Sequence, residues 1–194
     1  GETGPMSTPS ISSPIPFVPA EEDLPGSGWL ALDELVSGGT QGEAELIDCV
    51  GPEFPGPDET LDSASSPHFV RPTGQLVHGI AVVFETPEAT RRAAAVLRQS
   101  AFARCLGQSV VADLIAAPDD VEPLAIDEQA EEWGRRLSFT GVSGAGVVPV
   151  HLDLVVVDDA TVVSLLFLAD TPSPFPSEQR AHIVDCVSRR IHGL

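Results

Sequence analysis

Residues 75–88 read QLVHGIAVVFETPE, and this stretch decides the fold class. From Gln75 to Glu85 both alternating faces are largely apolar, which is typical of a central strand that is covered on both sides. Thr86-Pro87-Glu88 then begins a helix, with Thr86 as N-cap, Pro87 in the first turn and Glu88 near the positive end of the helix dipole. The apolar residues that follow recur at helical spacing: Ala89, Ala93, Val96 and Leu97.

Further strands are predicted towards the C-terminus. Residues 135–140 alternate as a strand and residues 141–146 form a turn. Residues 147–157 and 161–168 follow as two strands, joined by Asp158-Asp159-Ala160 in a hairpin. In the first of these two strands, we expect His151 and Asp153 to face water.

A closing helix is predicted from Ser177 to Ile191. Ser177 is its N-cap, and a stripe of apolar residues marks its buried face: Ile183, Val184, Val187 and Ile191. Because the late strands are joined by short turns, antiparallel pairing is favoured. The pattern therefore predicts a single-domain α+β fold, with one sheet and helices packed on it.

The rest of the chain is predicted as turns and loops with one short helix. Residues 50–67 contain four prolines and several acids and indicate a long loop. Residues 119–132 hold seven acids and indicate an exposed loop, and residues 100–105 favour a second short helix. Trp29, after the turn that begins at Leu24-Pro25, is expected to anchor in the core.

Three regions are expected along the chain. Residues 1–6 have the character of a cloning remnant, and residues 7–22 form a linker rich in Ser and Pro, in which Ile15, Phe17 and Val18 could rest on the domain. Residues 23–194 form the folded domain.

The charge excludes one class of partner. The formal net charge is -19, and the ten basic residues are all Arg. Because so negative a surface repels phosphate groups, we expect no nucleic-acid binding.

The longest apolar candidate for a membrane span, residues 152–168, is broken by three Asp and a Ser.

The cysteines indicate a compartment. Cys49 and Cys105 bracket the predicted strand and helix, as the two ends of a disulfide would, and a disulfide implies an oxidising environment. A pairing of Cys186 with either of them is the competing possibility. No Cys-x-x-Cys or Cys-x-His spacing occurs, so a zinc site is not expected.

Few residues are candidates for binding a ligand. Arg71, Arg135 and Arg136 lie on or beside predicted strands, where a guanidinium could hold an anionic ligand, and His151 is a further candidate. The alternative is that each Arg pairs with one of the 29 acids. The five histidines show no close metal-ligand spacing, and we expect neither a metal nor a cofactor.

Two other motifs are interpreted as structural. Residues 141–145, GVSGA, nearly match a hydrolase nucleophile elbow, but the last Gly is Ala and the motif joins two strands. Asp58-Glu59 and the acids at 119–122 lack EF-hand spacing and are expected to be solvated. We therefore expect no catalytic activity.

The order of several motifs resembles a known family. Asp48-Cys49-Val50-Gly51, then residues 79–84 with Glu88-Ala89 after them, then Ala103-Arg104-Cys105, are similar to the extracellular sensor domain of the mycobacterial PknH-type receptor kinases and to related actinobacterial lipoproteins. The resemblance covers residues 23–194. It implies a twisted antiparallel sheet with flanking helices, a central cleft for a small ligand, and a disulfide between Cys49 and Cys105. This chain lacks the family's second cysteine pair, so Cys186 is left as a buried free thiol.

The resemblance also implies a function. We expect an extracytoplasmic, sensor-like domain at the cell surface or in the envelope that recognises a small molecule or an envelope component in its cleft without catalysis. Its membrane tether would be a lipid or a transmembrane helix outside this sequence. The alternative is a cell-surface lipoprotein module that binds another protein, since exposed loops commonly carry recognition.

Overall fold

The computed structural model describes residues 14–33, 48–114, 125–143 and 146–193. Its strands are β1 (Leu30–Leu32), β2 (Thr60–Ser65), β3 (His68–Val70), β4 (Leu76–Phe84), β5 (Asp127–Glu131), β6 (Gly134–Ser143), β7 (Gly146–Asp159) and β8 (Val162–Asp170). Its helices are η1 (Ile15–Phe17), η2 (Glu21–Asp23), η3 (Pro57–Glu59), α2 (Pro87–Leu97), α3 (Ser100–Leu114) and α4 (Ser177–His192). Among these helices, none has the length and apolar character needed to span a membrane.

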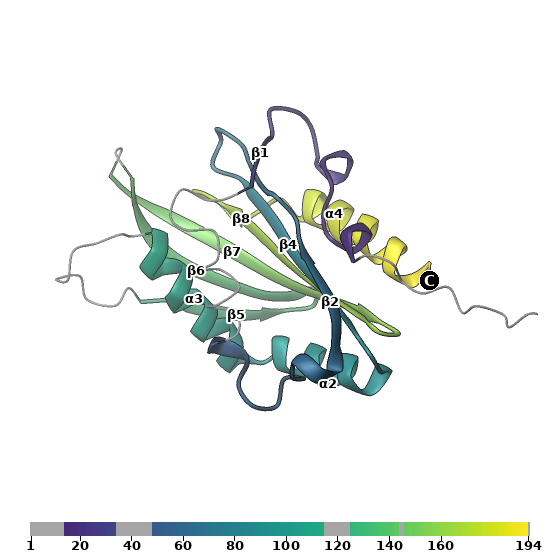
Figure 1. Cartoon of the computed structure of the whole chain (residues 1–194). Coiled ribbons are helices and arrows are strands. Elements are labelled where there is room, and N and C mark those ends of the chain that lie inside the picture. The colour runs from purple at the N-terminus through teal and green to yellow at the C-terminus, as the bar shows by residue number, and fades with distance from the viewer. Residues whose placement is uncertain (1–13, 34–47, 115–124, 144–145, 194) are drawn as a thin grey trace, which may run out of the picture.

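The strands form one antiparallel sheet in the order β1-β3-β4-β8-β7-β6-β5, and β2 pairs with the second half of β4. Helix α4 covers one face of this sheet, and α2 and α3 cover the other (Figure 1). The predicted class, an antiparallel α+β fold in a single domain, is confirmed.

Strand β4 is the centre of the sheet, as its apolar sequence predicts. It pairs with β8 from Leu76↔Ala169 to Val83↔Val162, and its other edge pairs with β3 and β2. Its alternating side chains enter two separate cores: Val77, Ala81 and Val83 pack beneath α4, and Ile80 and Phe84 pack beneath α2 and α3.

Helix α2 begins where the sequence predicts. The Thr86 side chain accepts a hydrogen bond from the Ala89 backbone N–H at 3.1 Å, which satisfies one of the free donors at the helix start. Small residues on its inner face, Ala89, Ala93 and Ala94, let the helix lie close to the sheet. Helix α3 is longer than predicted and runs to Leu114.

Helix α4 also matches its prediction. Ile183, Val187 and Ile191 are fully buried against the sheet, and Val184 is partly buried beside them. The prediction of Ser177 as N-cap is wrong, because Ser177 is the first residue of the helix, Pro176 occupies the capping position and no side chain caps it.

Residues 14–22, which the sequence assigns to a linker, lie against the domain. Phe17 and Val18 are buried in the core beneath α4, as predicted, whereas Ile15 is exposed. The Phe17 carbonyl accepts a hydrogen bond from Ser164 at 2.8 Å. Pro19 packs on Gly79 of β4, where a side chain would collide with it.

Two predicted loops contain strands. Strand β2 lies inside the predicted loop at 50–67, and β5 lies inside the predicted loop at 119–132. Both are edge strands with mostly polar and exposed or half-exposed side chains, so neither has the apolar alternation that marks a buried strand. Pairing with β4 holds β2 in the sheet, and pairing with β6 holds β5 there.

The disulfide between Cys49 and Cys105 is present, with the two Cα atoms 5.6 Å apart, and this confirms the predicted pairing. It joins the segment before β2 to α3. Cys186 has a free thiol, but it is half-buried and not buried as expected.

Asp153 was predicted to face water, but it is 0% exposed, so this prediction is wrong. Helix α4 covers the face of β7 that was expected to meet water. The Asp153 carboxylate accepts hydrogen bonds from Arg136 at 2.7 and 3.1 Å and from Arg180 of α4 at 3.1 Å. The Arg180 guanidinium lies 4.0 Å from the Trp133 ring centroid. These four residues, which we call the Asp153 cluster, join α4 to the sheet.

Replacing Asp153 with Asn should lower the free energy of unfolding by about 3–5 kcal/mol, because two buried guanidinium groups lose the carboxylate that they share. Denaturant unfolding followed by circular dichroism measures this change. Asp185→Asn is the matched control, since Asp185 is exposed and pairs with Arg189 one turn away; its effect should be below about 0.5 kcal/mol. Equal effects of the two substitutions would contradict the role given to the cluster.

Candidate functional site

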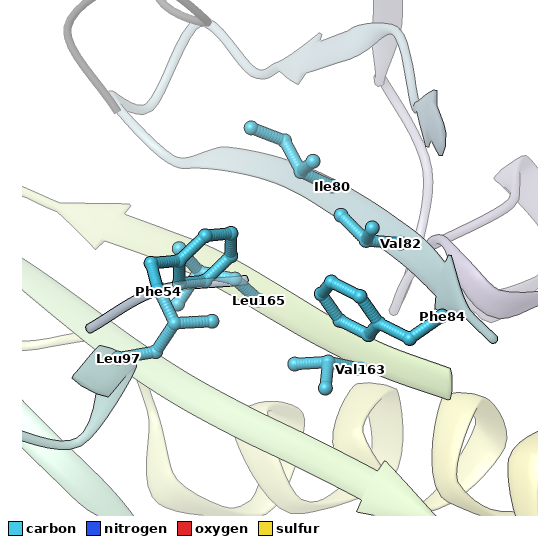
Figure 2. A pocket seen from close by; sticks show the side chains of 7 residues that line it. All are labelled: Phe54, Ile80, Val82, Phe84, Leu97, Val163 and Leu165. Atoms are coloured by element: carbon cyan, nitrogen blue, oxygen red, sulfur yellow. The ribbon is translucent and has the colours of Figure 1, made fainter. Parts of the chain in front are cut away.

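A hollow opens on the sheet face that α2 and α3 cover. Its lining side chains are all apolar: Phe54, Ile80, Val82, Phe84, Leu97, Val163 and Leu165. Figure 2 shows Ile80, Val82 and Phe84 in a row along β4, with Phe54 and Leu97 across from them. The empty volume is about 270 Å³, part of which is open to solvent. Because that volume includes open solvent, the hollow is a shallow apolar depression, well short of the enclosed pockets of about 300–1,000 Å³ that hold drug-sized ligands.

The wall of the hollow is held in place by covalent and ionic contacts. Phe54 contacts Phe84 edge to face, with ring centroids 6.0 Å apart. It follows Cys49 by five residues, so the disulfide to Cys105 ties its segment to α3. An ion pair between Glu59 of η3 and Arg92 ties the same loop to α2.

Two histidines stack on the same face of the sheet beyond Ile80, and neither of them lines the hollow. The rings of His68 and His78 stack with centroids 3.9 Å apart and planes 9° apart. His78 follows the same face of β4 as Ile80, and its ring lies 5.6 Å from that of Phe167. Burial, and to a lesser degree the neighbouring His68, lower the pKa of His78 to about 4, and burial also lowers the pKa of His68. Both rings are therefore neutral at neutral pH.

The stacked rings cannot share a metal ion. A metal bound to an imidazole nitrogen lies near the plane of that ring, and two parallel stacked planes have no such point in common. Within the described part of the chain, no three His, Cys, Asp or Glu side chains are grouped as metal ligands. The acids at 119–122 fall outside the described residues.

The four residues predicted to bind a ligand do not converge on one site. Arg135 lies on the α2 and α3 face, where it forms an ion pair with Glu128 and donates to the Arg98 carbonyl oxygen at 2.8 Å. Arg136 lies on the opposite face, within the Asp153 cluster. The pairing with acids that the sequence left as an alternative is thus what the structure shows for both of these arginines.

Arg71 and His151 are also engaged within the domain. Arg71 donates to the Gln75 side chain at 2.9 Å and lies over the Trp29 ring at 5.0 Å. The His151 nitrogens contact the Ser138 hydroxyl at 2.8 Å and the Pro172 carbonyl oxygen at 3.1 Å. The assignment of these residues to ligand binding stays a prediction.

The contact between Ser138 and His151 differs from a catalytic triad. In a triad, His Nε2 binds the serine and Nδ1 binds a carboxylate. Here Nδ1 contacts the serine, and Nε2 contacts a backbone carbonyl oxygen. The side chain of Ser143, in the motif that resembles a nucleophile elbow, lies outside the described residues.

Only some of the residues that form the hollow could be identified from the sequence. The alternation along β4 places His78, Ile80 and Val82 on one side of the strand. Phe54 comes from a loop, so nothing in the sequence brought it to the same place as these β4 residues.

Acid should weaken the folded state through the histidine pair. In the unfolded chain a histidine takes up a proton near pH 6.5, whereas His78 in the folded chain does so near pH 4. The folded state is therefore stabilised in full above about pH 6.5. Up to about 3 kcal/mol of the free energy of unfolding is lost as the pH falls from there to 4. His78→Phe should flatten the dependence of unfolding free energy on pH across this range. His182→Phe, at an exposed position of α4, should leave it unchanged; equal slopes in the wild type and His78→Phe would contradict the prediction.

No protein-family model matches the chain, and no curated protein matches it significantly in sequence. Among solved structures, the extracellular domain of PknH from Mycobacterium tuberculosis is similar with a TM-score of 0.42 and 10% identity, over 87% of this chain and 84% of that one. LpqN, involved in cell envelope biogenesis of the same organism, is similar with a TM-score of 0.26 and 11% identity, over 87% and 79% of the two chains. These structural neighbours are of the type that the sequence resemblance names.

Proposed function

We propose that this chain is an extracytoplasmic recognition domain of the cell envelope that binds a small apolar ligand or envelope component, without catalysis. The observation that carries the proposal is the hollow over β4 and β8, because it is lined by apolar side chains and is partly open to solvent. Concave apolar sites of this kind are the usual places where proteins bind small ligands.

The disulfide supports a location outside the cytoplasm. Structural disulfides persist in oxidising compartments and are rare where thiols are kept reduced. The bond between Cys49 and Cys105 also anchors the segment that carries Phe54, so it stabilises one wall of the hollow. A membrane tether on the N-terminal side of the domain remains part of the proposal.

The lining of the hollow supports binding without chemistry. Catalysis needs a nucleophile, an acid or a base in reach of the bound molecule. The hollow is lined by hydrocarbon and phenyl groups, and the Ser138–His151 pair lies on the face of β6 and β7 that carries the Asp153 cluster.

Binding of another protein is the second candidate function, and two exposed leucines favour it. Leu30 of β1 is 60% exposed and Leu61 of β2 is 62% exposed, and both strands lie at the same edge of the sheet. Exposed apolar residues at a strand edge are typical of contact surfaces.

A fluorescent apolar probe, N-phenyl-1-naphthylamine, tests the hollow as a binding site. Val82→Trp should weaken probe binding at least about tenfold, because the indole fills the space that the probe would occupy. Val184→Trp is the matched control, since Val184 is a half-buried valine on α4, on the opposite face; it should change the affinity less than about twofold. Thermal unfolding confirms that both variants fold. Failure of the wild type to bind the probe, or equal binding by Val82→Trp, would overturn the proposal.

A further inference from the structure

We propose that Arg71, in the turn between β3 and β4, binds the carboxylate group of a small ligand. Gln75, which Arg71 contacts, bonds to Gln179 in the first turn of α4, so the site lies on the face of the sheet opposite the hollow. The inference therefore goes beyond the function proposed above and does not depend on it.

Arg71 differs from the other arginines of the chain in its partners. Nine of the ten arginines form an ion pair with an acid: Arg91, Arg92, Arg98, Arg104, Arg135, Arg136, Arg180, Arg189 and Arg190. Among the described residues, no carboxylate pairs with Arg71, whose partners are the Gln75 side chain and the Trp29 ring. In a chain with 29 acids, a half-buried guanidinium without an acid beside it leaves its positive charge available to an anion from outside.

The guanidinium is held in one position by its neighbours. Its Nη1 donates to Gln75 Oε1 at 2.9 Å, and its plane lies over the Trp29 ring at 5.0 Å. Gln75 is 6% exposed and is fixed in turn, because its Nε2 donates to Gln179 at 2.9 Å and to Asp170 at 3.3 Å. The Trp29 indole donates to the Pro25 carbonyl oxygen at 2.8 Å. A group that is already ordered loses little conformational entropy when it binds a ligand.

The free side of the guanidinium fits a carboxylate. With Nη1 bonded to Gln75, the Nε and Nη2 groups of Arg71 have no acceptor in the part of the chain that the structure describes. The same two nitrogens of Arg136 bind both carboxylate oxygens of Asp153, at 2.7 and 3.1 Å. Gly26 passes beside Arg71 Nη2 without a side chain, and a Cβ there would lie 3.1 Å from that nitrogen. The two free nitrogens can therefore bind both oxygens of a carboxylate from outside.

The charge of the chain favours a singly charged ligand. The formal net charge is -19, and such a field repels each negative charge that a ligand carries. Asp170, on the far side of the Gln75 amide, adds to this repulsion. A carboxylate carries a single charge at neutral pH, whereas phosphate carries close to two. We therefore expect the site to prefer a carboxylate to phosphate.

Titration with sodium benzoate at pH 7.5, followed by ¹H–¹⁵N NMR, tests the site. The readouts are the indole N–H signals of Trp29 and Trp133, which Trp29→Phe assigns. Benzoate should shift the Trp29 signal saturably, because this indole lies beneath Arg71, and should leave the Trp133 signal in place. Benzamide has the same shape without the charge and should bind at least about tenfold more weakly. Inorganic phosphate at equal ionic strength should bind at least about threefold more weakly.

Substitutions of Arg71 should weaken benzoate binding in a graded way. Arg71→Gln should weaken it at least about tenfold, and Arg71→Lys, which keeps the charge but loses the paired donors, at least about threefold. Arg91→Gln is the matched control, because it removes the same charge from an exposed position on α2; it should change the affinity less than about twofold.

Four outcomes would overturn the inference: no saturable shift of the Trp29 signal, equal binding of benzamide and benzoate, phosphate binding as tight as benzoate, or unchanged benzoate binding by Arg71→Gln. The comparison of the three ligands on the wild type decides the question even if Arg71→Gln does not fold. None of these outcomes bears on the hollow, which N-phenyl-1-naphthylamine tests separately.

Discussion

The pairing of β4 with β8 is the constraint on which the rest of the structure depends. Eight consecutive residue pairs, from Leu76↔Ala169 to Val83↔Val162, fix which side chains of β4 face α4 and which face α2 and α3. Because side chains alternate along a strand, a shift of one residue would exchange the two sets. A shift of one residue along β8 would move Ile80 and Val82 out of the hollow and place Ala81 and Val83 there.

The two faces of the sheet are closed in different ways. On one face, α4 packs over a continuous apolar core, and the Asp153 cluster joins the helix to β6 and β7 through buried charges. On the other face, α2 and α3 cover the sheet, and a hollow stays open beside Phe54. The disulfide belongs to this second face, since it ties the segment before β2 to α3. The first face thus joins the last helix to the sheet, and the second face carries the hollow that is proposed as the ligand site.

Elements with strong local signals could be predicted from the sequence. The two apolar faces of β4, the Thr86 cap and the apolar stripe of α4 all depend on neighbouring residues, and the structure confirms them. Strands β2 and β5 are ordered by pairing with distant segments and carry no apolar pattern of their own. Asp153 was wrongly placed in water because its partner Arg180 lies on a helix 27 residues further along the chain. The hollow depends on Phe54, which only the folded chain brings to β4.

A crystal structure of the protein with N-phenyl-1-naphthylamine tests the central claim most directly, because it shows where an apolar ligand lies. The account predicts that the probe lies in the hollow, between Phe54 and Leu165. Density for the probe on the α4 face of the sheet, with none in the hollow, would contradict the account.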